Sequence, residues 1–440
     1  MRAVLVESCD RPPVVADRPV PSPGSSGSSG SSLSPGSGWV AVQVVAAPIT
    51  PLDLLCAGGT SYFGRPAVPY VPGVQGVGMV GGRPVWFPTS AGMAPGDGSM
   101  AEVAPARAED LVELPAGADP FAVAALGLSA VAAYMALTWR GGLRAGEQVL
   151  VLGGGGVVGQ AAIQLARLAG ARRVVAAARS AEGLERARQA GADAVVALNV
   201  PEPGDHGRAN PSLDPTATTR PAKTTGRVET TGLAETTSTA KTTGRAAIRP
   251  AKAADPTEST GSAESTGSAE STSPVEAISR AKAAGLAKGT GFAQVAGADG
   301  VTGLVRVAGA DEVAELAARL AGVCDGPVDL VLDPLYGVPA AAAARTLRKG
   351  GRLVNLGGSA SETCPLDSST LRSRSLRVLG YTNNELTREQ RAEAIAYIAH
   401  QSAAGRLTVA HEVVALEDAA AAWQRQTAGT TTGRIVLRTG

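Results

Sequence analysis

A run of four glycines, Gly153 to Gly156, followed by Gly159, is the part of the sequence best suited to chemistry. It contains two overlapping spacings, Gly-x-x-Gly-x-x-Gly from position 153 and Gly-x-Gly-x-x-Gly from position 154. Glycines let a backbone approach a pyrophosphate, and a helix that begins there offers unpaired N–H groups and the positive end of its dipole. By themselves, the same glycines would also suit a loop of another α/β protein. The residues expected to contact a dinucleotide are Gly153, Gly154, Gly156, Val157, Val158 and Gly159.

The segments around the glycines favour the dinucleotide. The apolar run Gln148–Leu152 predicts a buried parallel strand, and apolar residues at helical spacing predict a helix over 158–168. Gly170 ends that helix, and the apolar run Val174–Ala178 predicts the next strand. Strand, glycine turn, helix and strand form the context that a nucleotide-binding turn requires.

The corner after the second strand indicates which dinucleotide is bound. A site for NAD(H) needs an Asp or Glu there to bond the ribose 2′-hydroxyl group. This chain has Arg179 and Ser180, and its first acid, Glu182, lies past the corner. Arg179 can pair with a 2′-phosphate and Ser180 can donate to it, so the sequence predicts NADP(H). The alternative is that Arg179 is an ordinary solvated arginine.

Composition excludes several other functions. The 440 residues suggest two or three domains, and the net charge of +1 gives no argument for a nucleic acid, an anionic membrane or an acidic partner. The four cysteines form no Cys-x-x-Cys pair, which favours the reducing cytoplasm over a disulfide scaffold or a thiolate metal site. The apolar stretch 121–137 is just short of a membrane span, so we expect a buried helix there.

Short strands punctuated by Gly and Pro predict a β-rich domain over residues 1–118. Its expected strands are 1–6, 39–47, 74–80, 83–87, 100–103 and 112–115, with loops at 48–64 and 66–73. The Gly/Ser-rich tract 23–38 lies between two strand-like runs, so we interpret it as an expanded hairpin loop.

Alternating strands and helices over 119–385 predict a doubly wound parallel sheet of the Rossmann type. Its expected helices are 119–137, 182–190, 311–321 and 338–348, and its further strands are 194–198, 328–332, 352–356 and 376–380. Residues from about 200 to 305 have few large apolar side chains and carry short repeats, such as Glu-Ser-Thr with a six-residue period. We interpret them as a disordered insertion, because a β-solenoid would need regular apolar positions. The remaining segment predicts a helix at 388–400, a strand at 408–414, a helix at 416–426 and a strand at 434–437.

Four further motifs carry a family resemblance. They are Ile49-Thr50-Pro51-Leu52-Asp53, the run from Tyr70 to Gly78, Gly350-Gly351-Arg352-Leu353-Val354 and Gly433-Arg434-Ile435-Val436-Leu437. With the glycine turn, they resemble the medium-chain dehydrogenase/reductase superfamily, in its zinc-independent quinone oxidoreductase-like branch, over residues 1–200 and 311–440. The resemblance implies a GroES-like catalytic domain, residues 1–118 completed by 386–440, a Rossmann cofactor domain at 119–385, and a cytoplasmic homodimer.

The resemblance also bears on metal binding. Zinc alcohol dehydrogenases of this superfamily have Cys at the place of Thr50 and Gly-His-Glu at the place of Gly73-Val74-Gln75. Val74 cannot ligate, Thr50 and Gln75 are poor substitutes, and Cys56 is out of register, so we expect no metal.

Without a metal, the resemblance implies direct hydride transfer from NADPH to an electrophilic small molecule, a quinone or an α,β-unsaturated carbonyl compound. The candidate catalytic side chains are Tyr62, Thr50 and Asp53, although Tyr62 could instead be a packed surface aromatic and Asp53 a loop anchor. Ser129, Leu356 and Gly357 are expected to contact the cofactor by the same analogy. The alternative functions are a non-catalytic NADPH-binding protein, as a sensor or a crystallin-like relative, and an enoyl-thioester reductase.

Overall fold

A computed structural model describes residues 1–9, 11–21, 38–199, 292–296, 302–306 and 310–440. All of these lie in one compact unit, Met1–Leu213 with Phe292–Gly440. The predicted hairpin loop at 23–38, apart from Gly38, and the predicted disordered insertion between 200 and 291 lie outside the described residues.

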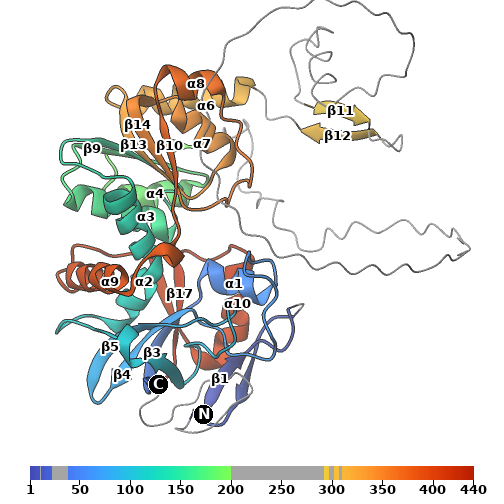
Figure 1. Cartoon of the computed structure of the whole chain (residues 1–440), viewed down its shortest axis with the longest axis vertical. Coiled ribbons are helices and arrows are strands. Elements are labelled where there is room, and N and C mark those ends of the chain that lie inside the picture. Colours follow the sequence, from blue (N-terminus) through green and yellow to red (C-terminus); the bar gives the residue numbers. More distant parts are fainter. Residues whose placement is uncertain (10, 22–37, 200–291, 297–301, 307–309) are drawn as a thin grey trace, which may run out of the picture. The chain divides into compact units, whose positions relative to one another are not determined.

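A parallel sheet of six strands holds the glycine turn (Figure 1). The strands are β8 (Gln148–Leu152), β9 (Arg173–Ala178), β10 (Ala194–Ala197), β13 (Val328–Asp333), β14 (Leu347–Asn355) and β15 (Arg377–Gly380). Their order is β10-β9-β8-β13-β14-β15, with every neighbouring pair parallel. This confirms the predicted Rossmann sheet. The order reverses between β8 and β13, and in open sheets of this kind ligands bind outside the carboxyl ends at that point.

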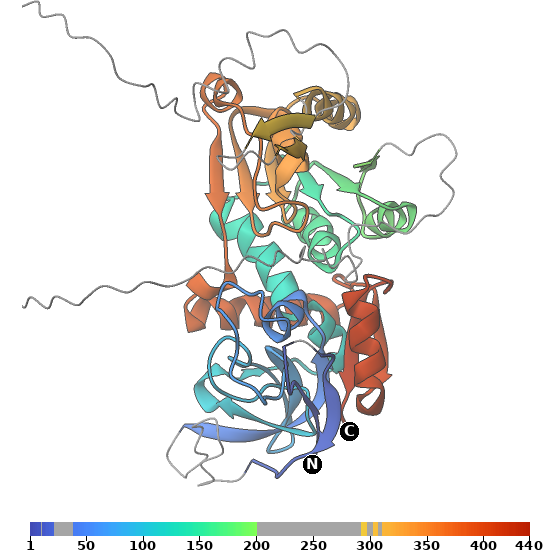
Figure 2. The same ribbon diagram turned by 90° about the vertical axis from the view of Figure 1, so that its right-hand side faces the viewer.

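Helices cover both faces of this sheet (Figure 2). They are α3 (Val157–Leu168), α4 (Ala181–Gln189), α6 (Ala310–Val323), α7 (Gly337–Ala344) and α8 (Ser368–Ser373). Alternate residues of β8 face opposite cores. Val149 and Val151 join the apolar cluster with α3, while Leu150 and Leu152 join the one with α6 and α7. A strand buried on both faces reads as a continuous apolar run, and this is why the sequence revealed it.

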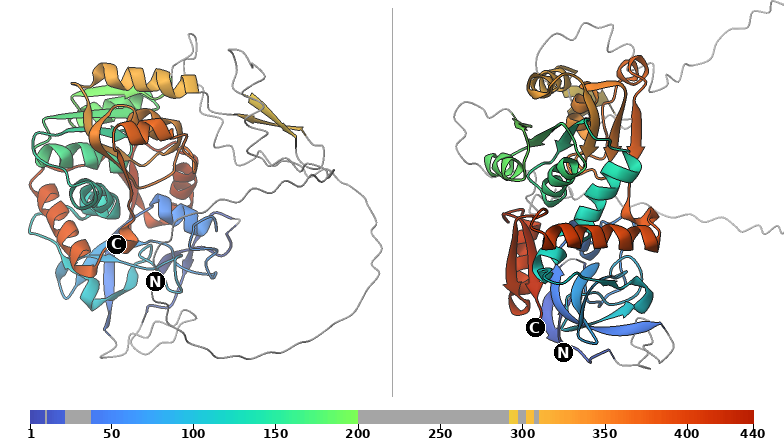
Figure 3. Two further views of the ribbon diagram at one scale, coloured as in Figure 1. Left: turned by 45° about the horizontal axis from the view of Figure 1, so that its top comes forward. Right: turned by 90° about the vertical axis from the view of Figure 1, so that its left-hand side faces the viewer.

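The second large sheet has seven strands and combines both ends of the chain (Figure 3). Its strands are β3 (Trp39–Pro48), β4 (Gln75–Val80), β5 (Arg83–Pro88), β6 (Val103–Arg107), β7 (Val112–Glu113), β16 (His411–Ala415) and β17 (Arg434–Arg438). The order is β16-β17-β3-β4-β5-β7, and β6 also pairs with β3. Strands of the C-terminal segment thus extend the sheet begun at β3, whereas the predicted domain boundaries at 118 and 385 stay predictions.

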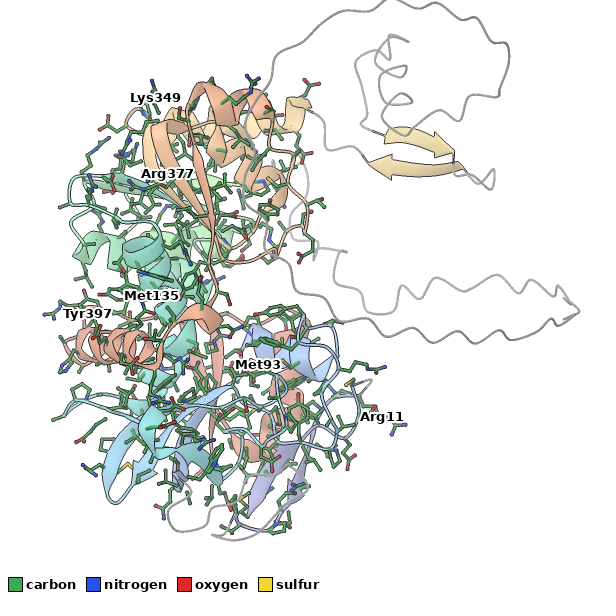
Figure 4. The ribbon with its side chains drawn as sticks, viewed as in Figure 1. Arg11, Met93, Met135, Lys349, Arg377 and Tyr397 are labelled. Carbon is green, nitrogen blue, oxygen red and sulfur yellow. The ribbon has the colours of Figure 1, made fainter. Side chains whose placement is uncertain are left out.

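Two helices pack between these sheets and on their flanks. They are α2 (Pro120–Met135), which continues as a π-helical turn over Ala136–Arg140, and α9 (Arg388–Ala403). Tyr134 of α2 stacks on Tyr397 of α9 at 4.8 Å between ring centroids, and Figure 4 labels Met135 and Tyr397 in this region. Among the described residues, one segment, Pro120–Arg140, is long and apolar enough to cross a membrane, but 61% of its apolar 18-residue window is buried inside the structure, as in a core helix.

The structure corrects the loop predicted at 48–64. Residues Pro51–Ala57 form helix α1. Thr50 is its N-cap, Pro51 stands in the first turn and Asp53 completes a capping box. These are the ordinary signals of a helix start, and they predict a helix within the motif that carried the family resemblance.

The predicted hairpin across 23–38 is also wrong. The first strand, β1 (Arg2–Leu5), pairs with β2 (Val14–Asp17) in a separate two-stranded sheet, and β3 belongs to the seven-stranded sheet. The Pro-rich stretch before β2 concealed this strand in the sequence.

The end of the predicted disordered insertion holds regular structure. Strands β11 (Phe292–Ala296) and β12 (Thr302–Arg306) pair antiparallel. Each contains Val and a larger apolar residue, which the low-complexity composition of the whole insertion obscured.

Three other boundaries differ from those predicted. Strand β6 begins at Val103, where the predicted strand 100–103 ends. Helix α7 ends at Ala344, before the predicted end at 348, and β14 begins at Leu347, before the predicted start at 352. The C-terminal segment ends with a 3₁₀ turn (Leu416–Asp418), α10 (Ala419–Thr427) and β17.

Candidate functional site

The glycine turn follows β8 directly and is tied to both neighbours. Gly153 has φ +66°, a conformation that favours glycine, and the N–H of Gly154 donates to the carbonyl of Ala177 in β9 at 2.9 Å. A Cβ atom on Gly159 would lie 2.2 Å from the carbonyl oxygen of Gly153. Only glycine therefore lets α3 begin this close to the end of β8.

The N-terminus of α3 is open to an anion. Its N-cap is Gly156, which has no side chain to occupy the first N–H groups, and the first turn contains no acidic residue. The N–H groups of Val157, Val158 and Gly159 have no partner within the helix. Space remains around Gly156, where an added Cβ would meet nothing closer than 3.5 Å. These donors and the helix dipole would hold a diphosphate.

Helix α4 braces the same turn. Gly155 packs on Gly183, where an added Cβ would lie 2.4 Å from the Gly183 Cα, and Arg186 donates from Nε to the carbonyl of Gly155 at 3.0 Å. The position of the phosphate donors therefore depends on α4 as well as on α3.

The corner after β9 carries the predicted selectivity residues. Arg179 and Ser180 are both exposed, and Arg179 has no hydrogen bond or ion pair with any described residue. Ser180 is the N-cap of α4, and its Oγ accepts from the N–H of Gly183 at 3.1 Å. The Ser180 hydroxyl group also hydrogen-bonds to the carboxylate of Glu182, the first acid past the corner. Hydrogen bonds from its own backbone N–H and from Ser180 lower the pKa of exposed Glu182.

The far side of the carboxyl edge, at the end of β13, contains a buried carboxylate that sequence reasoning missed. Asp333 is fully buried, and its Oδ1 accepts from the N–H groups of Leu335 at 2.9 Å and Tyr336 at 2.8 Å. Its Oδ2 accepts from Asn355 Nδ2 at 3.0 Å. Burial raises the pKa of Asp333, although these hydrogen bonds oppose the rise. A single Asp ending an apolar run was the available signal.

Leu356 and Gly357 lie beside this carboxylate. The N–H of Leu356 donates to the carbonyl of Asp333 at 2.9 Å, and Asn355 Nδ2 donates to the carbonyl of Gly357 at 2.9 Å. The loop after β13 also reaches the glycine turn, since a Cβ on Gly153 would lie 3.2 Å from Pro334 Cγ. The structure therefore brings the predicted glycines, Leu356 and Gly357 to one edge of the sheet.

Thr50 and Asp53 satisfy each other. Thr50 Oγ1 donates to Asp53 Oδ2 at 2.6 Å, and the backbone N–H of Thr50 donates to the same oxygen at 2.8 Å. Asp53 Oδ1 accepts from the N–H groups of Gly73 at 3.1 Å and Val74 at 2.9 Å. Burial raises the pKa of Asp53, while these bonds and the nearby charge of Arg434 oppose the rise. The carboxylate holds α1 to the segment before β4.

Ser129 is anchored by a buried arginine that sequence reasoning missed. Arg434 donates from Nη2 to Ser129 Oγ at 2.8 Å and from Nη1 to the carbonyl of Ile49 at 2.9 Å. Burial lowers the pKa of Arg434 to about 10, against the opposing charge of Asp53. Because Ser129 accepts from the guanidinium group, its own hydroxyl hydrogen remains available to another acceptor.

Gln75 holds a break in α2. Its Oε1 accepts from Trp86 Nε1 at 3.0 Å and from the N–H of Leu128 at 2.8 Å. The break lies at Gly127, with φ 31° and ψ −135°, where an added Cβ would lie 2.2 Å from Gln75 Oε1. Gln75 thereby fixes the backbone that carries Ser129.

Tyr62 lies apart from this buried group. Its side chain is 76% exposed, and its Oη accepts from Asn384 Nδ2 at 2.7 Å. Its ring lies 4.3 Å from that of Phe63, between centroids. No described hydrogen bond joins Tyr62 to Thr50 or Asp53, so the three predicted catalytic side chains do not form one hydrogen-bonded group.

Parts of the chain are similar to known proteins. Residues 157–206 and 308–437 match two family models, both described as zinc-binding dehydrogenase. Quinone oxidoreductase of Pongo abelii is 35% identical over 163 residues, which cover 35% of this chain and 48% of the relative. The human quinone oxidoreductase is 34% identical over 165 residues, 36% of this chain and 49% of the relative. The chain thus matches about half the length of these relatives.

Solved structures share the fold. A quinone oxidoreductase from Thermus thermophilus, also solved in complex with NADPH, superimposes with a TM-score of 0.60 at 23% identity and 100% coverage of both chains. An NAD-dependent alcohol dehydrogenase does so with a TM-score of 0.62 at 20% identity and 100% coverage of both. The matches to zinc-binding dehydrogenases and to quinone oxidoreductases thus cover parts of this chain, and the solved structures share its fold.

The residues at the places where zinc alcohol dehydrogenases carry their ligands do not fit a metal. Thr50 Oγ1 donates to Asp53, Val74 has no ligating atom, and Gln75 Oε1 already accepts two hydrogen bonds. Among the residues that the structure describes, no group of three His, Cys, Asp or Glu side chains could hold a metal ion. No chemical step is therefore assigned to zinc.

Proposed function

We propose that this protein is a zinc-independent oxidoreductase that uses NADP(H). The observation that carries the proposal is the open N-terminus of α3 at the switch point, with exposed Arg179 instead of a carboxylate at the corner of β9. The donors of α3 suit a diphosphate, and Arg179 with Ser180 suits a 2′-phosphate. The NADPH complex of the Thermus relative supports this choice, although a structural neighbour that uses NAD shows that the fold accepts either cofactor.

The acceptor that we propose is a quinone or an α,β-unsaturated carbonyl compound, as the names of the curated relatives suggest. Bound NADPH supplies a hydride. The protein holds the cofactor, orients the acceptor and offers a hydrogen-bond donor where negative charge develops on the acceptor oxygen. Two hydroxyl groups suit that task, because Ser129 and Tyr62 each accept one hydrogen bond and keep their own hydrogen free.

Thr50 and Asp53 have a supporting role in this proposal. Asp53 accepts four hydrogen bonds from Thr50, Gly73 and Val74 and is 1% exposed, so it neither contacts a substrate nor delivers a proton. The homodimer also belongs to the proposal, since β15 is an edge strand paired only with β14 in the described part of the chain.

NADPH absorbance followed with a panel of quinones and enones tests the function. We expect turnover well above the background rate with at least one acceptor, and a lower KM for NADPH than for NADH. Tight NADPH binding without turnover on any acceptor would contradict catalysis. It would favour the second candidate, a non-catalytic NADPH-binding protein, which the mutual satisfaction of Thr50 and Asp53 also allows. Turnover confined to enoyl thioesters would identify an enoyl-thioester reductase.

A further inference from the structure

The loop after β13 holds a tyrosine in a conformation that normally requires glycine. Tyr336 has φ 59° and ψ −160°. Only two non-glycine residues of the described chain have a positive φ, Tyr336 and Ser375. The combination at Tyr336 is populated almost exclusively by glycine, since the Cβ atom of other residues makes it costly.

The surrounding structure enforces this conformation. The N–H of Tyr336 donates to the buried carboxylate of Asp333 at 2.8 Å, and Asn355 holds the other oxygen of that carboxylate. Gly337, which follows, also has a positive φ of 64° and begins α7. A glycine at position 336 would satisfy the same bonds without strain, so the tyrosine side chain must serve another purpose to justify its backbone.

Tyr336 lies where a cofactor at the switch point would pass. Its loop touches the glycine turn through Pro334, on the other side of the crevice between β8 and β13. The Tyr336 side chain packs against the apolar cluster that joins β8, β9 and β13 to α6 and α7. It therefore lies on the α6 and α7 face of the sheet, at the carboxyl edge beside the switch point.

The side chain itself suits a flat, polar-edged ring. Tyr336 is half-buried, and its hydroxyl group has no hydrogen-bond partner among the described residues. We propose that Tyr336 lies against the adenine base of bound NADP(H) and that the strained backbone is retained to present its ring there. This inference rests on the proposed function. Aromatic side chains stack on nucleobases favourably, and such a contact needs the ring more than the hydroxyl group.

Calorimetric titration with NADPH and with 2′,5′-ADP tests the inference, because 2′,5′-ADP keeps the adenine and the 2′-phosphate but lacks nicotinamide. In Tyr336→Gly we expect the Kd of both ligands to rise about tenfold, the size of a lost base stack. The Tm should stay at or above that of the wild type, because relief of strain offsets lost packing. Tyr336→Phe keeps the ring and should bind both ligands within about twofold of the wild type.

Ser375→Gly is the matched control. Ser375 also has a positive φ, 48°, but it lies two residues before β15, at the amino end of that strand, whose first residue Arg377 is labelled in Figure 4. This substitution should raise the Tm and leave both Kd values unchanged.

Two results would overturn the inference. Unchanged Kd values in Tyr336→Gly would show that the ring does not touch the cofactor. Weaker NADPH binding with unchanged 2′,5′-ADP binding would place the contact at the nicotinamide half. Failure of the wild type to bind NADPH would instead refute the proposed function, and is seen before any variant is made.

Discussion

Replacement of Arg179 by alanine tests the assignment of the cofactor most directly. Arg179 lies at the corner of β9, exposed and without a partner among the described residues, so its removal breaks no internal contact. A hydrogen bond to a charged group contributes about 1.5–3 kcal/mol. Solvent screening at an exposed site reduces this to about 1–2 kcal/mol, which corresponds to a rise of about 5-fold to 30-fold in the Kd for NADPH. The Kd for NADH, which lacks the 2′-phosphate, should change less than about twofold.

Arg188→Ala is the control for this prediction. Arg188 is an exposed arginine of α4 whose Nη1 lies 3.2 Å from Glu185 Oε2, and its loss changes the net charge equally. Fluorescence titration at low and at physiological ionic strength should show a salt-dependent gap between NADPH and NADH in the wild type that Arg179→Ala loses and Arg188→Ala keeps. Equal weakening of NADPH and NADH by Arg179→Ala would refute the 2′-phosphate assignment.

Three further predictions concern stability and metal content. Gln75→Leu leaves Trp86 Nε1 and the N–H of Leu128 without an acceptor, so urea titration should show a free energy of unfolding lower by about 2–4 kcal/mol, and a loss under about 1 kcal/mol would contradict its bridging role. Glu147→Gln should cost about 3 kcal/mol at pH 7, because Glu147 pairs with buried Arg352. Burial raises the pKa of Glu147, but the bonds and charge of Arg352 outweigh it and the pKa lies below 4.5. The ion pair therefore contributes fully to the free energy of unfolding above pH 4.5, and this contribution is lost as the pH falls through the lowered pKa of Glu147. The difference in the free energy of unfolding between the wild type and Glu147→Gln should therefore become smaller in acid. A difference that does not change with pH would contradict the ion pair. Chelators should leave NADPH oxidation unchanged, and metal analysis that finds one zinc per chain would overturn the zinc-independent assignment.

Local patterns revealed the elements that lie within one stretch of chain. The strand before the glycines, the helix after them and the alternation of strands and helices in the parallel sheet all follow from apolar periodicity and Gly spacing. Gly159 is required by a clash that any Cβ would cause. Helix α1 could also have been predicted, since Thr50 and Asp53 form an ordinary capping box. The same residues are part of a family motif within the predicted loop.

Long-range contacts set the limit of the sequence. Nothing near Gln75 in the chain reveals that its side chain supports Leu128, and nothing near Ser129 reveals Arg434. Such bonds depend on how two sheets and a broken helix meet, which no periodicity encodes. The sequence also does not predict the positive φ of Tyr336, because a tyrosine before a glycine is common in loops of many kinds.

The pairing of β17 with β3 affects how the protein folds during its synthesis. Arg434 reaches back to Ile49 across 385 positions of chain. During synthesis, β3 therefore leaves the ribosome with one edge exposed and keeps it so until β17 has been made. Asp53 of helix α1 also lacks its facing cation during this time, since Arg434 is synthesised long after it. Chains that end before residue 434 therefore keep the edge of β3 unpaired, even when the six-stranded parallel sheet has already formed. Chaperones and proteases should recognise such chains by this open strand edge.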